Sequence, residues 1–180
     1  IKNNDIVKIV DVTNRPFNIY LIGSDSYGDI TKTSNGDVNM VFTINPKTNQ
    51  ILLTSIPRDY YVELYNTNGG MDKLTHASYY GIETAVKTVE TLLETDINYY
   101  ARVNFSTVVK IVDLIGGIEV NSDYSFCDSG RVGCYKKGYN KLNGEQALAF
   151  ARERKSFNGG DRVRGQNQQK VIKAIIDKVT

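Results

Sequence analysis

The spacing of apolar and polar residues changes from one stretch of the chain to the next. Residues 18–23 are nearly all apolar, which is typical of a strand buried on both faces of a sheet. Further strands are predicted over 38–44 and 51–56. The turn-forming residues 45–50 lie between these two strands, so the pair is expected to form a β-hairpin.

Helices are predicted where apolar residues recur every three to four positions. This spacing occurs over 82–93 and 105–115, and the second stretch ends at Gly116 and Gly117, which are typical of a helix C-terminus. The remaining predicted elements are two strands and two helices, over 99–104, 118–120, 144–150 and 161–179.

The register of the hairpin predicts where its charged residues lie. If Ile44 pairs with Ile51, the sum of paired residue numbers stays constant along the antiparallel strands, and Asp37 falls opposite Arg58. If the first strand also runs antiparallel to the second, Asp25 leaves the sheet at the same end. Three charged residues distant in sequence are therefore expected at one edge of the sheet, and a slip of one residue would weaken this grouping.

The composition is that of an ordinary globular protein, with 41% hydrophobic and 23% charged residues among 180. A chain of this length is expected to form one domain with a sizeable core. The formal net charge of +2 is too small to predict bulk binding to nucleic acid or to a membrane surface. Any anion site must therefore come from a local cluster of basic residues.

The two cysteines, Cys127 and Cys134, lie close together in a polar stretch with two glycines between them. Two cysteines alone do not complete a metal site, and no further ligand is evident nearby. A disulfide within a loop is the favoured interpretation, and it indicates a location outside the cytoplasm. Two free surface thiols are the alternative.

Basic residues gather in the stretch 150–168. It holds Arg152, Arg154, Arg162 and Arg164, which are half of the eight arginines in the chain. A guanidinium group offers a planar fork of donors that matches phosphate oxygens, so the cluster predicts an oxyanion site. A solvated basic face is the alternative interpretation. Arg152 and Arg154 are two residues apart, so both lie on one side if their segment is extended.

The final predicted helix continues this cluster onto its apolar face. Stepping back from that face by three and four residues reaches Gln168 and Arg164, whereas Arg162 points elsewhere. An inward-facing Arg or Gln needs a partner, which is either a bound ligand or an internal acid such as Asp25 or Asp37. The apolar face consists of Val171, Ile172, Ile175, Ile176 and Val179.

Seven short segments together resemble the LytR-CpsA-Psr family. No single segment is distinctive, but their order and spacing are highly specific, and they cover residues 17–171. The segments are Gly23-Ser24-Asp25-Ser26, Asp37-Val38, Ile56-Pro57-Arg58-Asp59, Asp72-Lys73-Leu74-Thr75-His76-Ala77, Gly116-Gly117-Ile118, Ala151-Arg152-Glu153-Arg154, and Asp161-Arg162 through Gln168.

The resemblance implies an α/β fold in which a mixed central β-sheet is flanked by helices, as an α-β-α sandwich with a pocket for a polyprenyl lipid. It implies that residues 1–16 lead in from a membrane anchor that this chain does not contain. Residues 17–180 are then expected to form the catalytic domain of the family. The expected location is the extracytoplasmic face of the cell membrane, mostly in Gram-positive bacteria.

The resemblance also implies a phosphotransferase activity. Family members are taken to move a glycopolymer, such as wall teichoic acid or capsule, from a polyprenyl-pyrophosphate carrier to peptidoglycan, and polyprenyl-pyrophosphatase activity is implied as well. The implied partners are the lipid-linked glycan, the peptidoglycan acceptor and the membrane, with no nucleic acid. A protein that binds lipid-linked or anionic cell-wall polymer without turning it over is the alternative.

Carried over residue by residue, the resemblance implies a Mg²⁺ site, which Mn²⁺ could also fill, at Asp25 and Asp37. Asp25 is also the expected general base toward the acceptor hydroxyl, which in the family is a sugar 6-hydroxyl of peptidoglycan. Lys73 is expected as an outer substrate-binding group. The groups expected around the pyrophosphate are Arg58, Arg152, Arg154, Arg164 and Gln168.

One position departs from the family pattern. The family commonly has an arginine two residues before the acid that matches Asp37, and this chain has Asn35 there. Asparagine can still donate a hydrogen bond, but it lacks the charge. A charge-assisted hydrogen bond contributes about 1.5–3 kcal/mol, so one contact to the pyrophosphate is expected to be weaker.

Overall fold

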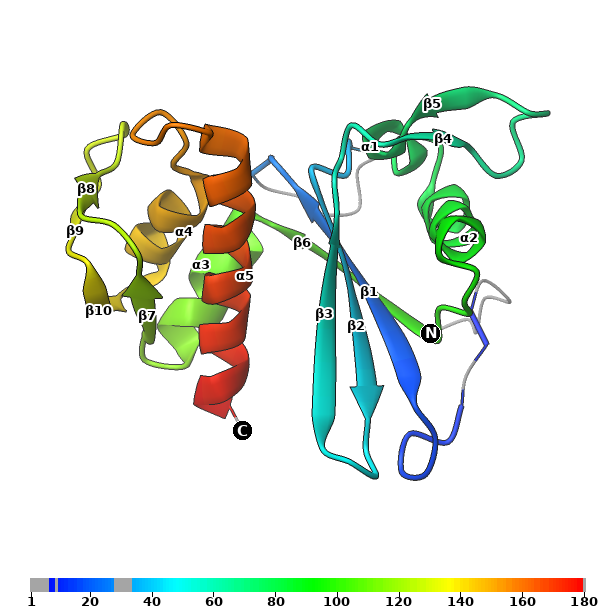
Figure 1. Cartoon of the computed structure of the whole chain (residues 1–180), viewed down its shortest axis with the longest axis horizontal. Helices are drawn as coiled ribbons and strands as arrows, with labels where there is room; N and C mark the ends of the chain where they lie inside the picture. Colours follow the sequence, from blue (N-terminus) through cyan, green and yellow to red (C-terminus); the bar gives the residue numbers. More distant parts are fainter. Residues whose placement is uncertain (1–6, 9, 28–33, 180) are drawn as a thin grey trace. The chain divides into compact units, whose positions relative to one another are not determined.

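The computed structural model describes residues 7–27 and 34–179, residue 9 excepted (Figure 1). The chain divides into two compact units, Ile1–Asn104 and Phe105–Thr180. Within the described residues, no helix is both long enough and apolar enough to cross a membrane. The expected boundary between a lead-in and a catalytic domain stays a prediction.

A mixed four-stranded sheet forms the centre of the first unit. Its strands are β1 (Phe17–Ser24), β2 (Val38–Asn45), β3 (Gln50–Ile56) and β6 (Tyr99–Asn104), in the order β3-β2-β1-β6. The strand β1 runs antiparallel to β2 and parallel to β6. The short β2–β3 connection allows a hairpin, whereas the parallel β1–β6 pair needs the long crossover that contains the helices.

The core of this unit lies between the sheet and α2 (Ile82–Leu93). The helix buries Ala85, Val86 and Val89 completely, and these side chains share one cluster with Tyr20 of β1. The helical spacing predicted from the sequence is therefore the spacing of this buried face. The other buried members of the cluster are Ile22, Val41, Ile56, Val62, Leu64, Leu74, Ala77 and Ile97.

A small second sheet connects β3 to α2. It pairs β4 (Tyr61–Glu63) with β5 (Met71–Lys73) and leads into the short helix α1 (Leu74–Ala77). The Thr75 amide donates a hydrogen bond to the Arg58 carbonyl at 2.9 Å. The backbone that carries Arg58 is therefore tied to the start of α1.

Helices and short strand pairs make up the second unit. Aromatic side chains form much of its core, because Phe126 packs 4.8 Å from Tyr135 and 5.5 Å from Phe150, measured between ring centroids. The strand β7 pairs with β10, and β8 pairs with β9, both antiparallel. The elements are α3 (Phe105–Leu114), β7 (Ile118–Ser122), β8 (Phe126–Cys127), β9 (Cys134–Tyr135), β10 (Gly138–Leu142), α4 (Gly144–Arg152) and α5 (Gly160–Val179).

The helix α4 has a capping box at its start. The Asn143 side chain accepts from the Gln146 amide at 2.9 Å, and the Gln146 side chain accepts from the Asn143 amide at 3.1 Å. The helix ends at Arg152, two residues beyond the predicted end.

The fold class is confirmed as α/β with a mixed sheet flanked by helices. The predicted hairpin is also confirmed, since β2 and β3 pair with Ile44 opposite Ile51. The predicted strands and helices of both units occur close to their expected positions.

The start of α5 depends on two adjacent glycines. Gly159 has a φ of +80°, a conformation that favours glycine. A Cβ on Gly160 would collide with the carbonyl oxygen of Arg154 and lie 3.1 Å from its carbonyl carbon. The helix can therefore begin directly against the backbone of the arginine segment.

We expect Gly160→Ala to lower the free energy of unfolding by about 1–3 kcal/mol, because the added methyl group must displace backbone. Gly165→Ala is the matched control in the same helix, since no atom lies within 4 Å of its Cβ position. That change should be neutral or stabilise by up to about 1 kcal/mol through helix propensity. Urea unfolding followed by circular dichroism measures both, and equal effects would contradict the close packing.

Candidate functional site

The predicted charged group at one edge of the first sheet is present. The pairing of Ile44 with Ile51 continues along the hairpin to Asn39 and Ile56, and the same register places Asp37 opposite Arg58 two residues beyond that last pair. Arg58 Nη1 donates to Asp37 Oδ1 at 2.8 Å in a part-buried ion pair. The register argument therefore placed these two side chains correctly.

Asp25 joins the same group through its backbone. Its amide donates to Asp37 Oδ2 at 3.1 Å, and the Asp37 amide donates to the Gly23 carbonyl at 2.8 Å. Each oxygen of the Asp37 carboxylate thus accepts from a residue that follows a different strand, β1 or β3. The side chain of Asp25 is exposed at this edge, as the prediction required.

A buried polar network supports the turn that carries Asp37. The Tyr20 hydroxyl donates to Asn39 Oδ1 at 2.6 Å, and Asn39 Nδ2 donates to the Gly36 carbonyl at 2.9 Å. Tyr20 and Asn39 are 0% and 1% exposed, so these bonds form away from water. Burial raises the pKa of Tyr20 above its ordinary value, which keeps the hydroxyl protonated as a donor.

Gly36 leaves little room for a side chain beside this network. A Cβ there would lie 2.7 Å from Ser78 Oγ and 3.2 Å from Asn39 Oδ1. The Gly36 amide donates to the Thr75 carbonyl at 2.9 Å, so the turn is attached to α1 as well. Asn35, where the family commonly has arginine, is exposed just before this turn.

Further charged residues extend the edge beyond Arg58. Lys73 Nζ donates to Asp59 Oδ1 at 2.8 Å, and Arg58 Nε lies 3.6 Å from Asp59 Oδ2. The Lys73 hydrogen bond is the main cause that holds the pKa of Asp59 below its ordinary value. Lys73 and Arg58 therefore share Asp59 as an acidic partner. His76 Nδ1 lies 2.9 Å from Asp72 Oδ2, a contact between residues four apart that was not predicted.

The arginine cluster of the second unit is organised by Asp161. Arg164 Nη2 lies 3.1 Å from Asp161 Oδ1, and Arg154 Nη1 lies 3.9 Å from the same oxygen. Asp161 and Arg164 are three residues apart on α5, a spacing that brings side chains together. The expected partner of Arg164 was a ligand or a distant acid, and this local acid was not predicted. Arg162 is exposed, as predicted.

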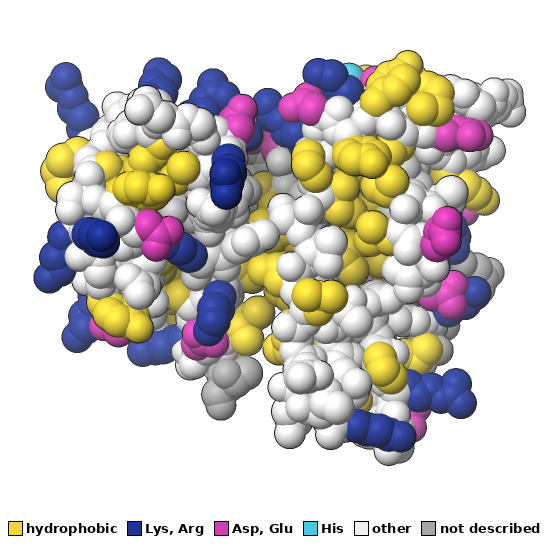
Figure 2. Space-filling view, in the orientation of Figure 1, with side chains coloured by type: hydrophobic (Ala, Val, Ile, Leu, Met, Phe, Trp, Pro, Cys, Tyr) yellow, Lys and Arg dark blue, Asp and Glu magenta, His cyan; other side chains and the backbone are white. Residues whose placement is uncertain are grey.

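The other predicted residues of this cluster lie on α4 and α5. The Arg152 guanidinium lies over the Phe105 ring, 4.2 Å from its centroid, in a cation–π contact. Gln168 is half-buried on α5. On the face in Figure 2, basic side chains occur at several separate places over the second unit, so the cluster is one local group among scattered charges.

Glu153, between Arg152 and Arg154, is the residue that the sequence analysis missed. It is 3% exposed, and its carboxylate accepts from the Ser129 amide at 2.6 Å and from the Ser156 amide at 2.9 Å. Burial alone would raise the pKa of Glu153, but hydrogen bonds from Ser129 and Ser156 outweigh it and lower the pKa to about 2. One signal in the sequence could have indicated it: if Arg152 and Arg154 lie on one side of an extended segment, Glu153 points to the other side.

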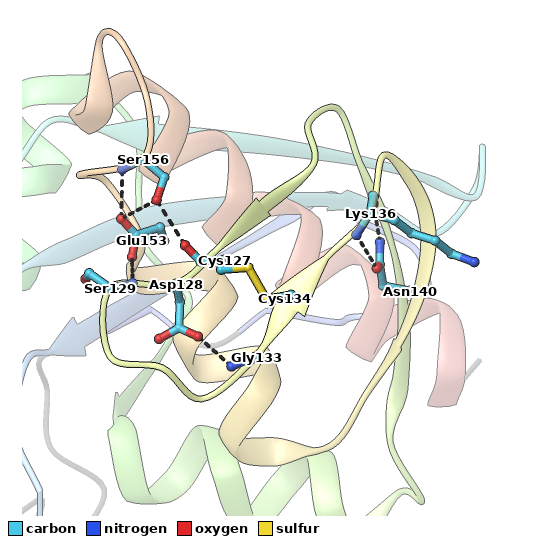
Figure 3. The surroundings of a disulfide bond; sticks show 9 residues. All are labelled: Cys127, Asp128, Ser129, Gly133, Cys134, Lys136, Asn140, Glu153 and Ser156. Carbon is cyan, nitrogen blue, oxygen red and sulfur yellow. Dashed lines mark hydrogen bonds between the residues drawn. A yellow bond between two sulfur atoms is a disulfide. The ribbon is translucent and has the colours of Figure 1, made fainter.

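The predicted disulfide between Cys127 and Cys134 is present, so the alternative of two free thiols is wrong (Figure 3). It closes a loop in which Asp128 Oδ1 accepts from the Gly133 amide at 2.6 Å. Beside this loop, a cleft of about 480 Å³ lies over β9 and β10, and none of the predicted site residues lines it.

The edge of the first sheet that carries Asp25 and Asp37 could hold a metal ion only if a bound substrate or water supplied further ligands. Among the described residues, no group of three or more His, Cys, Asp or Glu side chains is arranged to hold one. Asp25 and Asp37 offer two carboxylates, and each carboxylate can accept more than the bonds described. This set fits Mg²⁺, which often takes one or two carboxylates together with substrate phosphates and water.

We expect Tyr20→Phe to lower the free energy of unfolding by about 1–3 kcal/mol, because Asn39 Oδ1 would lose its donor in a buried site. Tyr61→Phe removes the same atom from a side chain that is 64% exposed and should change stability by less than about 0.5 kcal/mol. Chemical denaturation compares the two, and a neutral Tyr20→Phe would show that the hydroxyl does not support the Asp37 turn.

The stability of the protein should depend on pH through Glu153. Because its folded pKa is lowered to about 2 from an ordinary value near 4.5, its contribution is complete above pH about 4.5 and is lost as the pH falls through 2. The full contribution is on the order of 2–3 kcal/mol. The free energy of unfolding of Glu153→Gln should therefore be lower than that of the wild type at pH 7. This difference should narrow as the pH falls from about 4.5 to about 2. A gap that is constant with pH would contradict this origin.

The sequence matches the model of the LytR_cpsA_psr family over residues 1–180. Among curated proteins, the polyisoprenyl-teichoic acid–peptidoglycan teichoic acid transferase TagU of Bacillus mycoides (strain KBAB4) is 42% identical over 166 residues, covering 92% of this chain and 53% of that protein. The chain spans about half the length of the curated relatives it matches.

Solved structures share the fold. TagV of B. subtilis has a TM-score of 0.80 and 35% identity, covering 92% of this chain and 65% of that one. The LytR-CPS2A-psr family protein YwtF (TagT) with bound octaprenyl pyrophosphate lipid has a TM-score of 0.79 and 32% identity, covering 96% of this chain and 68% of that one. Because the family model matches residues 1–180, the chain belongs to the LytR-CpsA-Psr family.

Proposed function

We propose that this chain is the catalytic part of a phosphotransferase that moves a cell-wall glycopolymer, such as teichoic acid, from a polyprenyl-pyrophosphate carrier to peptidoglycan. The observation that carries the proposal is the grouping of Asp25, Asp37 and Arg58 at one end of a sheet in a member of this family. The relatives support it, since TagU proteins are named as transferases of this kind, and TagT has been solved with LI-WTA bound.

The basic residues supply the chemistry that a pyrophosphate diester needs. Arg58, Arg152, Arg154 and Arg164 would contact its oxygens, and Gln168 would orient one phosphate. Guanidinium groups stabilise charge that spreads over phosphoryl oxygens, so their contribution is mainly positioning and electrostatics. The Asp161 carboxylate supports this role, because it already holds Arg154 and Arg164 around one anionic group.

Asp25 and Asp37 would hold Mg²⁺, directly or through water, and Mn²⁺ could take its place. When bound, the metal would neutralise charge on the pyrophosphate oxygens. Asp37 is fixed by Arg58 and by the Asp25 amide, so its carboxylate keeps one orientation for this purpose. The exposed Asp25 carboxylate would accept the proton of the acceptor hydroxyl on peptidoglycan as that oxygen attacks the phosphorus that carries the glycopolymer. The pyrophosphate P–O bond then breaks, and polyprenyl phosphate leaves.

The same site would act as a polyprenyl pyrophosphatase when water replaces the sugar hydroxyl. The reaction then releases phosphate from a polyprenyl diphosphate and needs no acceptor polymer. We propose that the protein works on the extracytoplasmic face of the membrane, and the disulfide supports this location because such bonds persist in oxidising compartments.

We expect the protein to release phosphate from a polyprenyl diphosphate in the presence of Mg²⁺. Asp37→Ala and Arg164→Ala should each lower kcat/KM at least about hundredfold, because each removes a charge aimed at the reacting group. Arg162→Ala is the matched control for Arg164→Ala and should retain wild-type rates, since Arg162 is exposed outside the proposed site. Chelation with EDTA should also stop the release.

Colorimetric phosphate detection with purified variants separates the outcomes. Wild-type rates in both Asp37→Ala and Arg164→Ala would overturn the site assignment. Tight lipid binding that needs no metal, together with no phosphate release by the wild type, would favour a non-catalytic binder of lipid-linked polymer. The uncharged, exposed Asn35 is the feature of the chain that agrees with that second function.

A further inference from the structure

Glu153 and the disulfide loop are joined by hydrogen bonds that the activity proposed above does not use. The Ser129 amide of the loop donates to Glu153 Oε2 at 2.6 Å, and the Ser156 hydroxyl donates to the Cys127 carbonyl at 3.1 Å (Figure 3). The Ser156 amide and hydroxyl also donate to Glu153 Oε1, at 2.9 and 3.2 Å. The segment that leads out of Arg152 is therefore bound to the loop on both sides of Arg154.

The loop itself is held closed at its neck. The disulfide joins Cys127 to Cys134, and the Asp128 amide donates to the Gly133 carbonyl at 3.0 Å. Asp128 is 6% exposed, and its side chain accepts from the Gly133 amide (Figure 3). The position of Ser129, which carries the bond to Glu153, is thus set by several constraints rather than by one.

The loop is also attached to the hydrophobic core. Phe126, directly before Cys127, packs 5.5 Å from Phe150 and 4.7 Å from Phe157, measured between ring centroids. These two rings lie on either side of the arginine segment in the sequence. The same strand end thus contacts the segment before Arg152 and after Arg154.

The negative charge of Glu153 is unexpected between two arginines of a proposed anion site. A carboxylate between two arginines lowers the positive potential that an anion meets, so electrostatics alone would disfavour it in an anion site. Its burial and its bonds to Ser129 and Ser156 give a different reason for its presence. They hold the backbone between Arg152 and Arg154 in one extended conformation.

We propose that Glu153, supported by the disulfide-closed loop 127–134, is a positioning residue that holds Arg152 and Arg154 in place for the phosphate groups of the substrate. This inference rests on the proposed function, in which both arginines contact the pyrophosphate. Glu153 acts through the arginines and the loop and does not touch the substrate itself.

A purely electrostatic or stabilising role and a positioning role of Glu153 predict different changes in the affinity of Glu153→Gln for inorganic pyrophosphate. If it acted only as a charge or as a general stabiliser, Glu153→Gln would leave the affinity for inorganic pyrophosphate unchanged or raise it. As a positioning residue, its replacement should weaken that affinity about tenfold, because displaced arginines lose their alignment. Isothermal calorimetry with inorganic pyrophosphate and Mg²⁺, on full-length variants kept well below their melting temperatures, measures this directly.

The disulfide is tested in the same experiment by C127S/C134S. This variant should also weaken pyrophosphate binding and lower kcat/KM for geranylgeranyl diphosphate about tenfold. Combined with Glu153→Gln, the loss should be clearly less than the product of the two separate losses, because both act on the same segment. Ser125→Ala is the control, since its hydroxyl accepts from the Lys137 amide near the loop, without a described contact to residues 153–156.

Arginine variants separate a failure of this inference from a failure of the function on which it rests. If Arg152→Ala and Arg154→Ala bind pyrophosphate as tightly as the wild type, the proposed function is wrong and the inference falls with it. If they lose binding while Glu153→Gln and C127S/C134S retain it, the inference alone is overturned. Amide exchange at Ser156 gives a check that needs no ligand, because it should quicken in C127S/C134S and would stay slow if the loop gave no support.

Discussion

The end of the sheet in the first unit depends on one carboxylate. Asp37 precedes β2, the strand that lies between β1 and β3, and it accepts one bond from the residue after β1 and another from the residue after the β3 edge. Strand ends usually lose their partners where the ladder stops, yet here a single acid joins three of them. The buried hydrogen bonds of Tyr20 and Asn39 below it hold the preceding turn, so the position of the acid is set by groups of the protein itself.

The second unit uses acids in a comparable way, although it arranges arginines instead of strands. Asp161 draws Arg154 and Arg164 to a common oxygen, and Glu153 fixes the backbone between Arg152 and Arg154. Basic groups that are close together repel one another and lose side-chain freedom when they are ordered. Neighbouring acids offset part of both costs, and this explains how several arginines can remain close in a protein of small net charge.

The grouping of Asp25, Asp37 and Arg58 was predictable because the paired residue numbers of antiparallel strands have a constant sum. Once Ile44 is paired with Ile51, every later pair follows, and the register is confirmed. The disulfide was predictable for a similar reason, since it follows from spacing along the chain. The predicted apolar face of α5 was right only in part. Val171 is buried, but Val179 is 62% exposed, and the helix also buries Val163, Asn167 and Ala174, which the spacing argument left out. The role of Glu153 was not predictable, because one of its partners, the Ser129 amide, lies in a loop 24 residues away, and such a contact leaves no period in the sequence. The same holds for Gly160, whose role depends on the nearness of the Arg154 carbonyl.

Asp161 also bears on which ligands the arginine cluster can accept. It sits among the arginines as a built-in competitor, so an incoming anion must offer Arg154 and Arg164 more than one carboxylate already does. A singly charged ion such as chloride or acetate gains little from the exchange, whereas a pyrophosphate brings several oxygens and more than one charge. Because the Asp161 side chain is 73% exposed, this competition is weak, and it favours multiply charged ligands over singly charged ones only modestly.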